Sequence, residues 1–227
     1  IGCEGKNKTE KLYFKNFNSR QCMIKFSNGN STDPKGIVED VIRFIKNNQI
    51  ELEENDKVYA VFDTDVRQNK QQQIEEAKRL AEEYGVEIIT STPAFEIWFL
   101  LHFRYTTKAF ASNKALQDEL KKQIPEYSKN NNTYITVKDL TGQAIDNAKR
   151  LEQYQLIEGQ VLDSEDCNPY TGVYKITEEL INRNKDAKFA LFVKKGGYIY
   201  IVVPGMKKDC HEHIPKELLL SWTPEQL

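Results

Sequence analysis

Residues 57–65 read KVYAVFDTD, and this stretch decides the fold class. Its first six residues form a short, nearly continuous apolar run, which is the pattern of a strand buried on both faces of a parallel sheet. Asp63 and Asp65 stand at the carboxyl end of that strand. Ligands of open parallel sheets collect at this end, where loops and helix N-termini converge. The stretch therefore predicts both the kind of sheet and the place of its site.

Strand and helix patterns alternate around this stretch. Strands are predicted at residues 1–3, 21–27 and 86–90, and helices at residues 10–18, 37–48 and 68–84. Because the chain opens with Ile1 rather than Met, we expect the first strand to begin upstream. Strands that alternate with long helices imply right-handed crossovers and a mostly parallel sheet covered by helices. The predicted fold class is α/β.

The second half of the chain is mainly helical in pattern. Helices are predicted at residues 94–104, 113–123, 137–155 and 174–183, the first of them apolar almost all round and therefore deeply buried. Residues 188–193 and 198–203 predict a β-hairpin. We expect an α/β core at residues 1–105, a helical region completing the domain at 106–183, and a C-terminal extension of unassigned role at 184–227.

Composition limits the classes of function. The 227 residues are 39% hydrophobic and 29% charged, as in a globular domain. The longest apolar stretch falls far short of the ~20 residues that span a bilayer, so no membrane association is expected. Four scattered cysteines (Cys3, Cys22, Cys167 and Cys210) predict free thiols in a reducing cytoplasm. The net charge of −2 means that any attraction to nucleic acid must come from local lysines and bound cations.

Three carboxylates are expected to meet at the sheet edge. Glu4 follows the first strand, and alternation in an extended segment would point Asp63 and Asp65 the same way, with Cα atoms about 6.6 Å apart. Carboxylates within ~4 Å repel by roughly 4 kcal/mol per pair at an effective dielectric of 20, so such a cluster requires a cation. An all-oxygen set favours Mg²⁺, with Mn²⁺ as a substitute. Taken alone, the Asp-Thr-Asp motif has an alternative reading as a helix-capping loop.

The motif pair Cys3-Glu4-Gly5 and Asp63-Thr64-Asp65 resembles the Toprim signature of topoisomerases, primases and overcoming-lysogenization-type nucleases. Four stretches narrow the resemblance to RloB-like proteins: CEGKNKTEKLYF (3–14), VFDTD (61–65), STPAFEIWFLLHF (91–103) and NPYTGVYKI (168–176). The resemblance covers about residues 1–183, while the tail from residue 185 resembles nothing associated with that family.

The resemblance implies a reaction. Glu4 would be the acid/base or metal-adjacent group, and Asp63 and Asp65 would hold Mg²⁺ against a phosphate oxygen while water attacks phosphorus in line. The expected activity is a Mg²⁺-dependent nuclease acting on DNA or structured RNA, as an antiphage effector from restriction or abortive-infection loci, often beside a partner ATPase. The alternative is a non-catalytic module that binds a nucleotide or Mg²⁺ and regulates that ATPase. A topoisomerase or primase would need machinery that the chain does not show.

Further candidates each have a structural alternative. Glu96 sits in an apolar helix, where a buried carboxylate needs a cation, a donor or a proton; the alternative is a first-turn glutamate favoured by the helix dipole. His102 is a catalytic candidate whose alternative is a hydrogen-bonded core histidine.

The candidates for substrate binding are Lys6, Lys8 and Thr9, at a helix N-terminus that can receive a phosphate, and, by resemblance, Asn168 and Thr171. Their alternatives are solvated lysines and plain helix caps. Near the end, Asp209, Cys210, His211 and His213 fit a flexible polar loop better than a soft-metal site, because no second Cys/His pair accompanies them.

Overall fold

The computed structural model describes residues 1–4, 9–65, 71–186, 191–195 and 198–202. Its main sheet has the order β1-β2-β3-β4, formed by β1 (Gly2–Cys3), β2 (Tyr59–Asp63), β3 (Glu87–Thr92) and β4 (Tyr170–Thr171). The first three strands are parallel, and β4 pairs antiparallel with β3. The predicted α/β class with a mostly parallel sheet is confirmed, and the arrangement is consistent with a Toprim-like fold.

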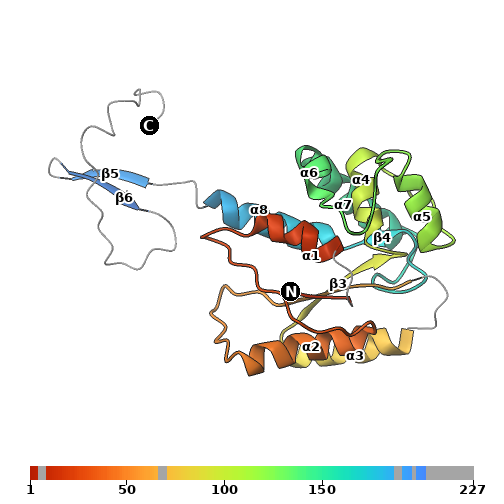
Figure 1. Ribbon diagram of the computed structural model, residues 1–227, viewed down its shortest axis with the longest axis horizontal. Helices are drawn as coiled ribbons and strands as arrows, with labels where there is room; N and C mark the ends of the chain where they lie inside the picture. Colours follow the sequence, from red (N-terminus) through yellow and green to blue (C-terminus); the bar gives the residue numbers. More distant parts are fainter. Residues whose placement is uncertain (5–8, 66–70, 187–190, 196–197, 203–227) are drawn as a thin grey trace.

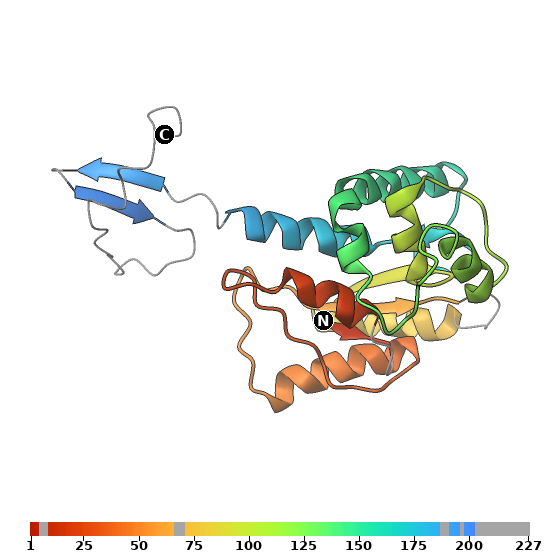
Figure 2. The same ribbon diagram turned by 45° about the horizontal axis from the view of Figure 1, so that its top comes forward.

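Helices cover both faces of this sheet (Figures 1 and 2). On one face lie α2 (Pro34–Asn47) and α3 (Gln71–Glu83), and on the other lie α1 (Thr9–Phe14), α4 (Glu96–Phe103), α7 (Thr141–Ile157) and α8 (Val173–Asp186). The side chains of β2 alternate between two hydrophobic clusters, with Val61 in one and Ala60 and Phe62 in the other. This double burial is what the apolar run of β2 predicts.

The remaining elements are short. They are η1 (Lys15–Phe17), α5 (Asn113–Leu120), α6 (Tyr134–Val137), η2 (Lys138–Leu140), β5 (Leu191–Lys195) and β6 (Tyr198–Val202). The predicted hairpin is present, because β5 and β6 pair antiparallel. The C-terminal candidates Asp209, Cys210, His211 and His213 lie outside the described residues. None of the helices in the described ranges has both the length and the apolar character needed to cross a bilayer.

The apolar helix α4 lies at the centre of the larger hydrophobic cluster. Trp98 and the leucines of α4 are fully buried, which confirms the prediction for this segment. Tyr13 of α1 makes edge-on ring contacts with Phe95, Trp98 and Phe99, with centroids 5.8–6.2 Å apart. Contacts of this geometry add stability beyond the area that they bury. They fix α1 against α4, and each of these helices carries a buried carboxylate.

One predicted strand, residues 21–27, is wrong. The segment runs beside β1 as irregular chain, bonded to it where the Ile1 ammonium donates to Lys25 O (2.7 Å) and Ser27 N donates to Ile1 O (3.0 Å). Because β1 is two residues long, it offers too few backbone groups for a ladder along the whole segment. The described cysteines Cys3, Cys22 and Cys167 are buried free thiols, as expected, and Cys210 lies outside the described residues.

Candidate functional site

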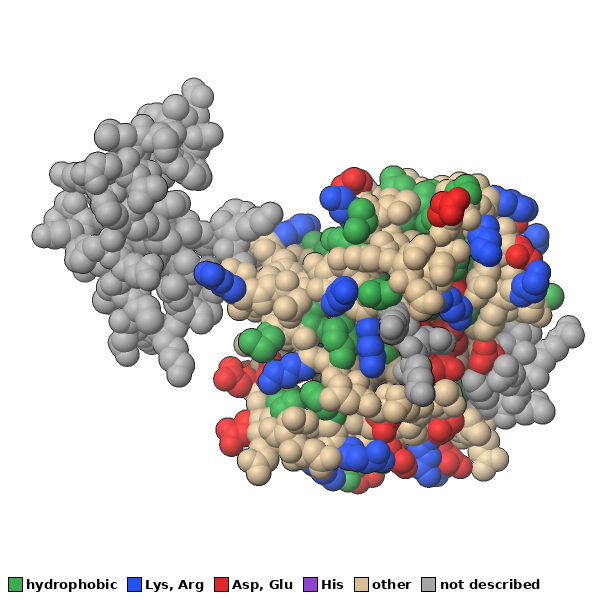
Figure 3. Space-filling model, viewed as in Figure 1, with side chains coloured by type: hydrophobic (Ala, Val, Ile, Leu, Met, Phe, Trp, Pro, Cys, Tyr) green, Lys and Arg blue, Asp and Glu red, His purple; other side chains and the backbone are tan. Residues whose placement is uncertain are grey.

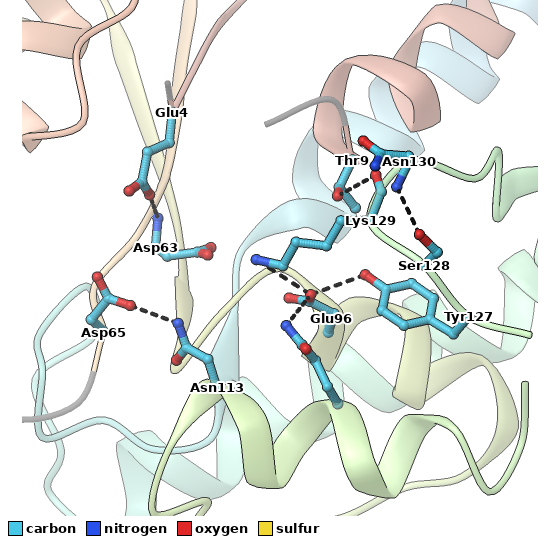
Figure 4. A network of polar contacts seen from close by, with 11 residues as sticks. Glu4, Thr9, Asp63, Asp65, Glu96, Asn113, Tyr127, Ser128, Lys129 and Asn130 are labelled. Atoms are coloured by element: carbon cyan, nitrogen blue, oxygen red, sulfur yellow. Dashed lines mark hydrogen bonds and ion pairs between the residues drawn. The ribbon is translucent and has the colours of Figure 1, made fainter. Parts of the chain in front are cut away.

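The ends of β1 and β2 bring two of the expected carboxylates together. Parallel pairing places Cys3 opposite Val61, so the chain leaves both strands at the same sheet edge. There, the backbone N–H of Asp63 donates a hydrogen bond to Glu4 Oε2 at 3.3 Å (Figure 4). Two residues 59 positions apart in sequence therefore meet where ligands of parallel sheets collect.

Asp65 departs from the expected geometry. Its φ of 51° is in the left-handed region, which aspartate tolerates better than most residues, so the extended chain does not continue through it. The prediction that extended alternation aligns Asp63 with Asp65 is therefore wrong. Asp65 Oδ1 instead accepts a hydrogen bond of 2.7 Å from Asn113 Nδ2, at the first residue of α5. The helical insertion thus holds one of the three predicted metal ligands.

Glu10 and Glu96 extend the acidic site inward. Glu96, at the start of α4, is 1% exposed, and Glu10 in α1 is 4% exposed. Glu96 Oε1 accepts hydrogen bonds of 2.9 Å from Gln117 Nε2 and from the Tyr127 hydroxyl. Lys129 Nζ lies 3.6 Å from the same oxygen (Figure 4). These partners provide both the donor and the cation that the sequence requires for a buried glutamate.

The carboxylates perturb one another. Burial raises the pKa of Asp63 well above its usual value, and the charges of Glu10, Glu4 and Glu96 raise it further. Burial also raises the pKa of Glu10 to about 7, with Glu96 and Glu4 acting in the same direction. Glu10 Oε2 has no hydrogen-bond partner among the described residues. A proton or an added cation would stabilise this cluster of Glu4, Glu10, Asp63 and Glu96, which we call the acidic cluster.

Among the described residues, Lys129 supplies a positive charge to the acidic cluster. Its burial opposes the charged form, but the carboxylates of Glu96, Asp63 and Glu10 outweigh that effect and raise the pKa of Lys129. The Lys129 carbonyl accepts a hydrogen bond of 3.1 Å from Thr9 Oγ1 at the start of α1. Figure 4 shows the ammonium pointing between Asp63 and Glu96.

A second contact fixes the loop that carries Lys129. The side-chain amides of Asn16 and Asn132 bond reciprocally, at 3.2 and 3.1 Å. Asn16 lies in η1, directly after α1. The loop is thus attached at the Lys129 carbonyl and again at Asn132, which fixes the backbone from which the Lys129 side chain enters the site.

The other sequence candidates make contacts with residues outside the acidic cluster, or lie outside the described residues. His102 is fully buried, shares a hydrogen bond with Trp98 O at 2.9 Å, and burial lowers its pKa to about 4, as befits the core alternative. The Asn168 side chain bonds both backbone groups of Phe110.

The remaining substrate-binding candidates are Thr171, which the structure describes, and Lys6 and Lys8. Thr171 belongs to β4, pairs with Ser91 Oγ at 2.9 Å and accepts a hydrogen bond from Val173 N, which favours a structural role. Lys6 and Lys8 lie outside the described residues.

The fit of the site to a divalent cation is mixed. Its possible ligand atoms are all oxygens and include Glu10 Oε2, which is buried and has no hydrogen-bond partner within the described part of the chain; this is the chemistry of a hard cation site. Yet within the described ranges no group of three or more Asp, Glu, His or Cys side chains is arranged to hold a metal ion. The Mg²⁺ site therefore stays a prediction.

The sequence pattern does not single out five of the residues that build this site: Glu10, Asn113, Gln117, Tyr127 and Lys129. Glu10 reads as a first-turn glutamate, and Lys129 lies in a polar loop of serine and asparagine. One indirect signal is present in the sequence. A glutamate buried at position 96 requires hydrogen-bond or charged partners, but the sequence does not identify which residues supply them.

The protein surface carries mixed charge. Over the described part of the face seen in Figure 3, lysines and arginines are interspersed with acidic side chains. This pattern agrees with the net charge of −2. Attraction of a polyanion would depend on local features such as Lys129 rather than on the whole surface.

Comparison with known proteins gives one family. No curated protein matches the chain, and no solved structure does. The family described as RloB-like protein matches over residues 1–180, which spans the sheet, the acidic cluster and the helical insertion. The chain therefore belongs to the RloB-like protein family.

Proposed function

We propose that the protein cleaves phosphodiester bonds in nucleic acid with Mg²⁺ held by Asp63, Asp65 and Glu4. One observation carries the proposal: Glu4 and Asp63 meet at the carboxyl ends of neighbouring parallel strands, inside the acidic cluster that Lys129 reaches. Such a concentration of buried and half-buried carboxylates is unfavourable for folding and is typical of catalytic sites.

Each residue has a task in this reaction. Burial and the neighbouring carboxylates raise the pKa of Asp63, and this residue would hold the cation together with Asp65 and Glu4. Asn113 holds Asp65 at the edge of the site. When bound, Mg²⁺ neutralises charge that develops on the phosphoryl group and makes water more acidic. Glu4 takes the proton of the attacking water; the new P–O bond forms as the bond to the leaving oxygen breaks, and that oxygen takes up a proton.

The wider role is part of the same proposal. Family membership supports an antiphage effector that acts on DNA or structured RNA, with an ATPase as partner. The competing proposal is a regulatory module that binds a nucleotide without cleaving it. Cleavage by the purified chain distinguishes the two.

The experiment is a cleavage assay on supercoiled plasmid and on bulk tRNA, with Mg²⁺, Mn²⁺ or EDTA. Asp63→Asn and Glu4→Gln should each lower the rate by about 10²-fold or more. Glu39→Gln, a matched change of an exposed glutamate on α2, should leave the rate unchanged. Equal cleavage by all variants would refute the assigned site, and intact substrate together with Mg²⁺-dependent nucleotide binding would favour the regulatory module.

A further inference from the structure

The ammonium of Lys129 is more than a partner for Glu96. Glu96 Oε1 already accepts two hydrogen bonds of 2.9 Å, from Gln117 and Tyr127. Lys129 Nζ stands 3.6 Å from that oxygen, beyond the 2.7–2.9 Å of a tight charge-assisted hydrogen bond. Glu96 Oε1 is therefore hydrogen-bonded by neutral donors, and the Lys129 ammonium, with three N–H groups, balances its charge without a tight hydrogen bond.

The position of Lys129 is set by its backbone. Thr9 Oγ1 donates to the Lys129 carbonyl, and the amide pair of Asn16 and Asn132 attaches the loop a few residues further on. Contacts of this kind fix the start of the side chain, while its flexible stem lets the ammonium move over a short distance. Figure 4 shows it on the same side of the site as the Asp63 carboxylate.

The charges at the site explain why a substrate would need this lysine. Even with Glu10 protonated, the acidic cluster keeps the carboxylates of Glu4, Asp63 and Glu96, whose charge a single divalent cation does not balance. An anionic phosphodiester that approached such a site would still be repelled. A positive side chain at the cluster removes part of this repulsion and offers donors to a phosphate oxygen.

We propose that Lys129 is a catalytic residue that binds a non-bridging oxygen of the scissile phosphodiester, leaving its loose contact with Glu96 as substrate and cation enter. The inference rests on the proposed function, because it names the group that receives the substrate phosphate. Lys129 holds the phosphate and stabilises the charge that develops on it, and transfers no proton.

The test uses the full chain and three variants. Lys129→Met removes the charge at similar length, Lys129→Arg keeps it, and Lys121→Met is the control, an exposed lysine at the end of α5 in the same insertion. Mg²⁺ binding is measured by calorimetry without substrate. Binding of a short fluorescein-labelled single-stranded DNA is measured by anisotropy in Ca²⁺ at several salt concentrations. Cleavage is measured with Mg²⁺ as above, and thermal unfolding verifies that each variant is folded.

Lys129→Met should change the affinity for Mg²⁺ and the affinity for DNA in opposite directions. Lys129→Met should bind Mg²⁺ more tightly, by about tenfold, because a positive charge has left the acidic cluster. It should bind the DNA about tenfold more weakly, with a salt slope reduced by about one ion, and cleave about 10²-fold more slowly. Lys129→Arg should retain DNA binding with reduced cleavage, and Lys121→Met should match the parent chain.

Other outcomes separate this inference from the proposed function. If Asp63→Asn abolishes cleavage and Lys129→Met does not, the inference is overturned and the proposed function stands. Tighter Mg²⁺ binding with unchanged DNA affinity would reduce Lys129 to a counter-ion and also overturn it. If the parent chain cleaves nothing, the proposed function fails, and the loss of DNA affinity in Lys129→Met would still support the phosphate contact.

Discussion

Replacing Glu10 by glutamine should change how the stability of the metal-free protein depends on pH. Glu10 is buried in α1 with one carboxylate oxygen lacking a partner among the described residues. Glutamine has nearly the same shape and stays neutral at every pH. The substitution therefore removes the titration of this group while it keeps the packing of α1.

The size of the effect follows from the pKa. Burial and the neighbouring charges of Glu96 and Glu4 raise the pKa of Glu10 from 4.5 to about 7. The folded chain thus binds this proton more tightly than the unfolded chain. The corresponding stability is fully present below pH 4.5 and is lost as the pH rises through about 7. Linkage converts the difference into about 3 kcal/mol, most of which falls between about pH 5 and pH 8.

His102 has the opposite effect on the pH dependence of stability, over nearly the same pH range. Burial lowers its pKa from 6.5 to about 4, so the stability that it contributes is present above pH 6.5 and lost as the pH falls through about 4. The two effects oppose each other in the parent chain, whereas the raised pKa of Asp63 favours the folded state at low pH, as that of Glu10 does. The difference between Glu10→Gln and the parent cancels the contribution of His102 and retains that of Glu10, together with the effect of the Glu10 charge on Asp63.

The assay is denaturant unfolding in EDTA at several pH values, followed by the fluorescence of the buried Trp98. From about pH 5 to pH 8, Glu10→Gln should gain roughly 2–3 kcal/mol relative to the parent. The control Glu39→Gln, at an exposed site, should gain nothing. A constant difference between Glu10→Gln and the parent would refute the reasoning, because it would mean that Glu10 is not forced toward its protonated form.

Three further predictions concern the surroundings of the acidic cluster. Asn113→Ala releases Asp65 from its 2.7 Å hydrogen bond and should weaken Mg²⁺ binding by about tenfold in calorimetry. Tyr127→Phe removes a hydroxyl donor to the buried Glu96 and should lower the free energy of unfolding by about 1–3 kcal/mol in denaturant titrations. His102→Leu removes a histidine that folding keeps neutral, and should gain about 3 kcal/mol relative to the parent as the pH falls from 6.5 to 4.

Matched controls make these predictions refutable. Tyr154→Phe, on the exposed side of α7, should leave stability unchanged, so an equal loss in both tyrosine variants would contradict the role given to the Tyr127 hydroxyl. Unchanged Mg²⁺ affinity in Asn113→Ala would show that Asp65 is not a ligand or needs no tether. A pH-independent difference for His102→Leu would mean that the histidine is not kept neutral by its burial.

Local patterns were sufficient to predict most of the fold. The apolar run before Asp63 is buried on both faces as β2, and the all-round apolar segment at residues 94–104 contains α4. Both patterns are formed by consecutive residues, so they can be recognised without knowledge of the tertiary structure. The strand β4 has two residues, too few for a periodic pattern, and residues 21–27 have strand-like alternation but only the short β1 beside them.

The candidate site was predictable only in part. The convergence of Glu4 with Asp63 follows from strand order, because parallel strands end at one sheet edge. The left-handed turn at Asp65 depends on local backbone detail that no pattern of apolar residues reports. Glu10 and Lys129 are 119 residues apart by their numbers, and only the docking of a loop on α1 brings their charges together. Contacts of that range have no signature in one sequence.

The hydrogen bonds of the Lys129 loop to Thr9 and Asn16 join this loop with α1 and η1, which lie 116–120 residues away in sequence, into one structural unit. A site transplanted onto another scaffold would have to carry the loop and α1 together, since either piece alone brings carboxylates without their lysine or a lysine without its anchor. For the same reason, libraries that randomise residues 126–132 should vary positions 9 and 16 in the same pool, where compensating pairs can appear.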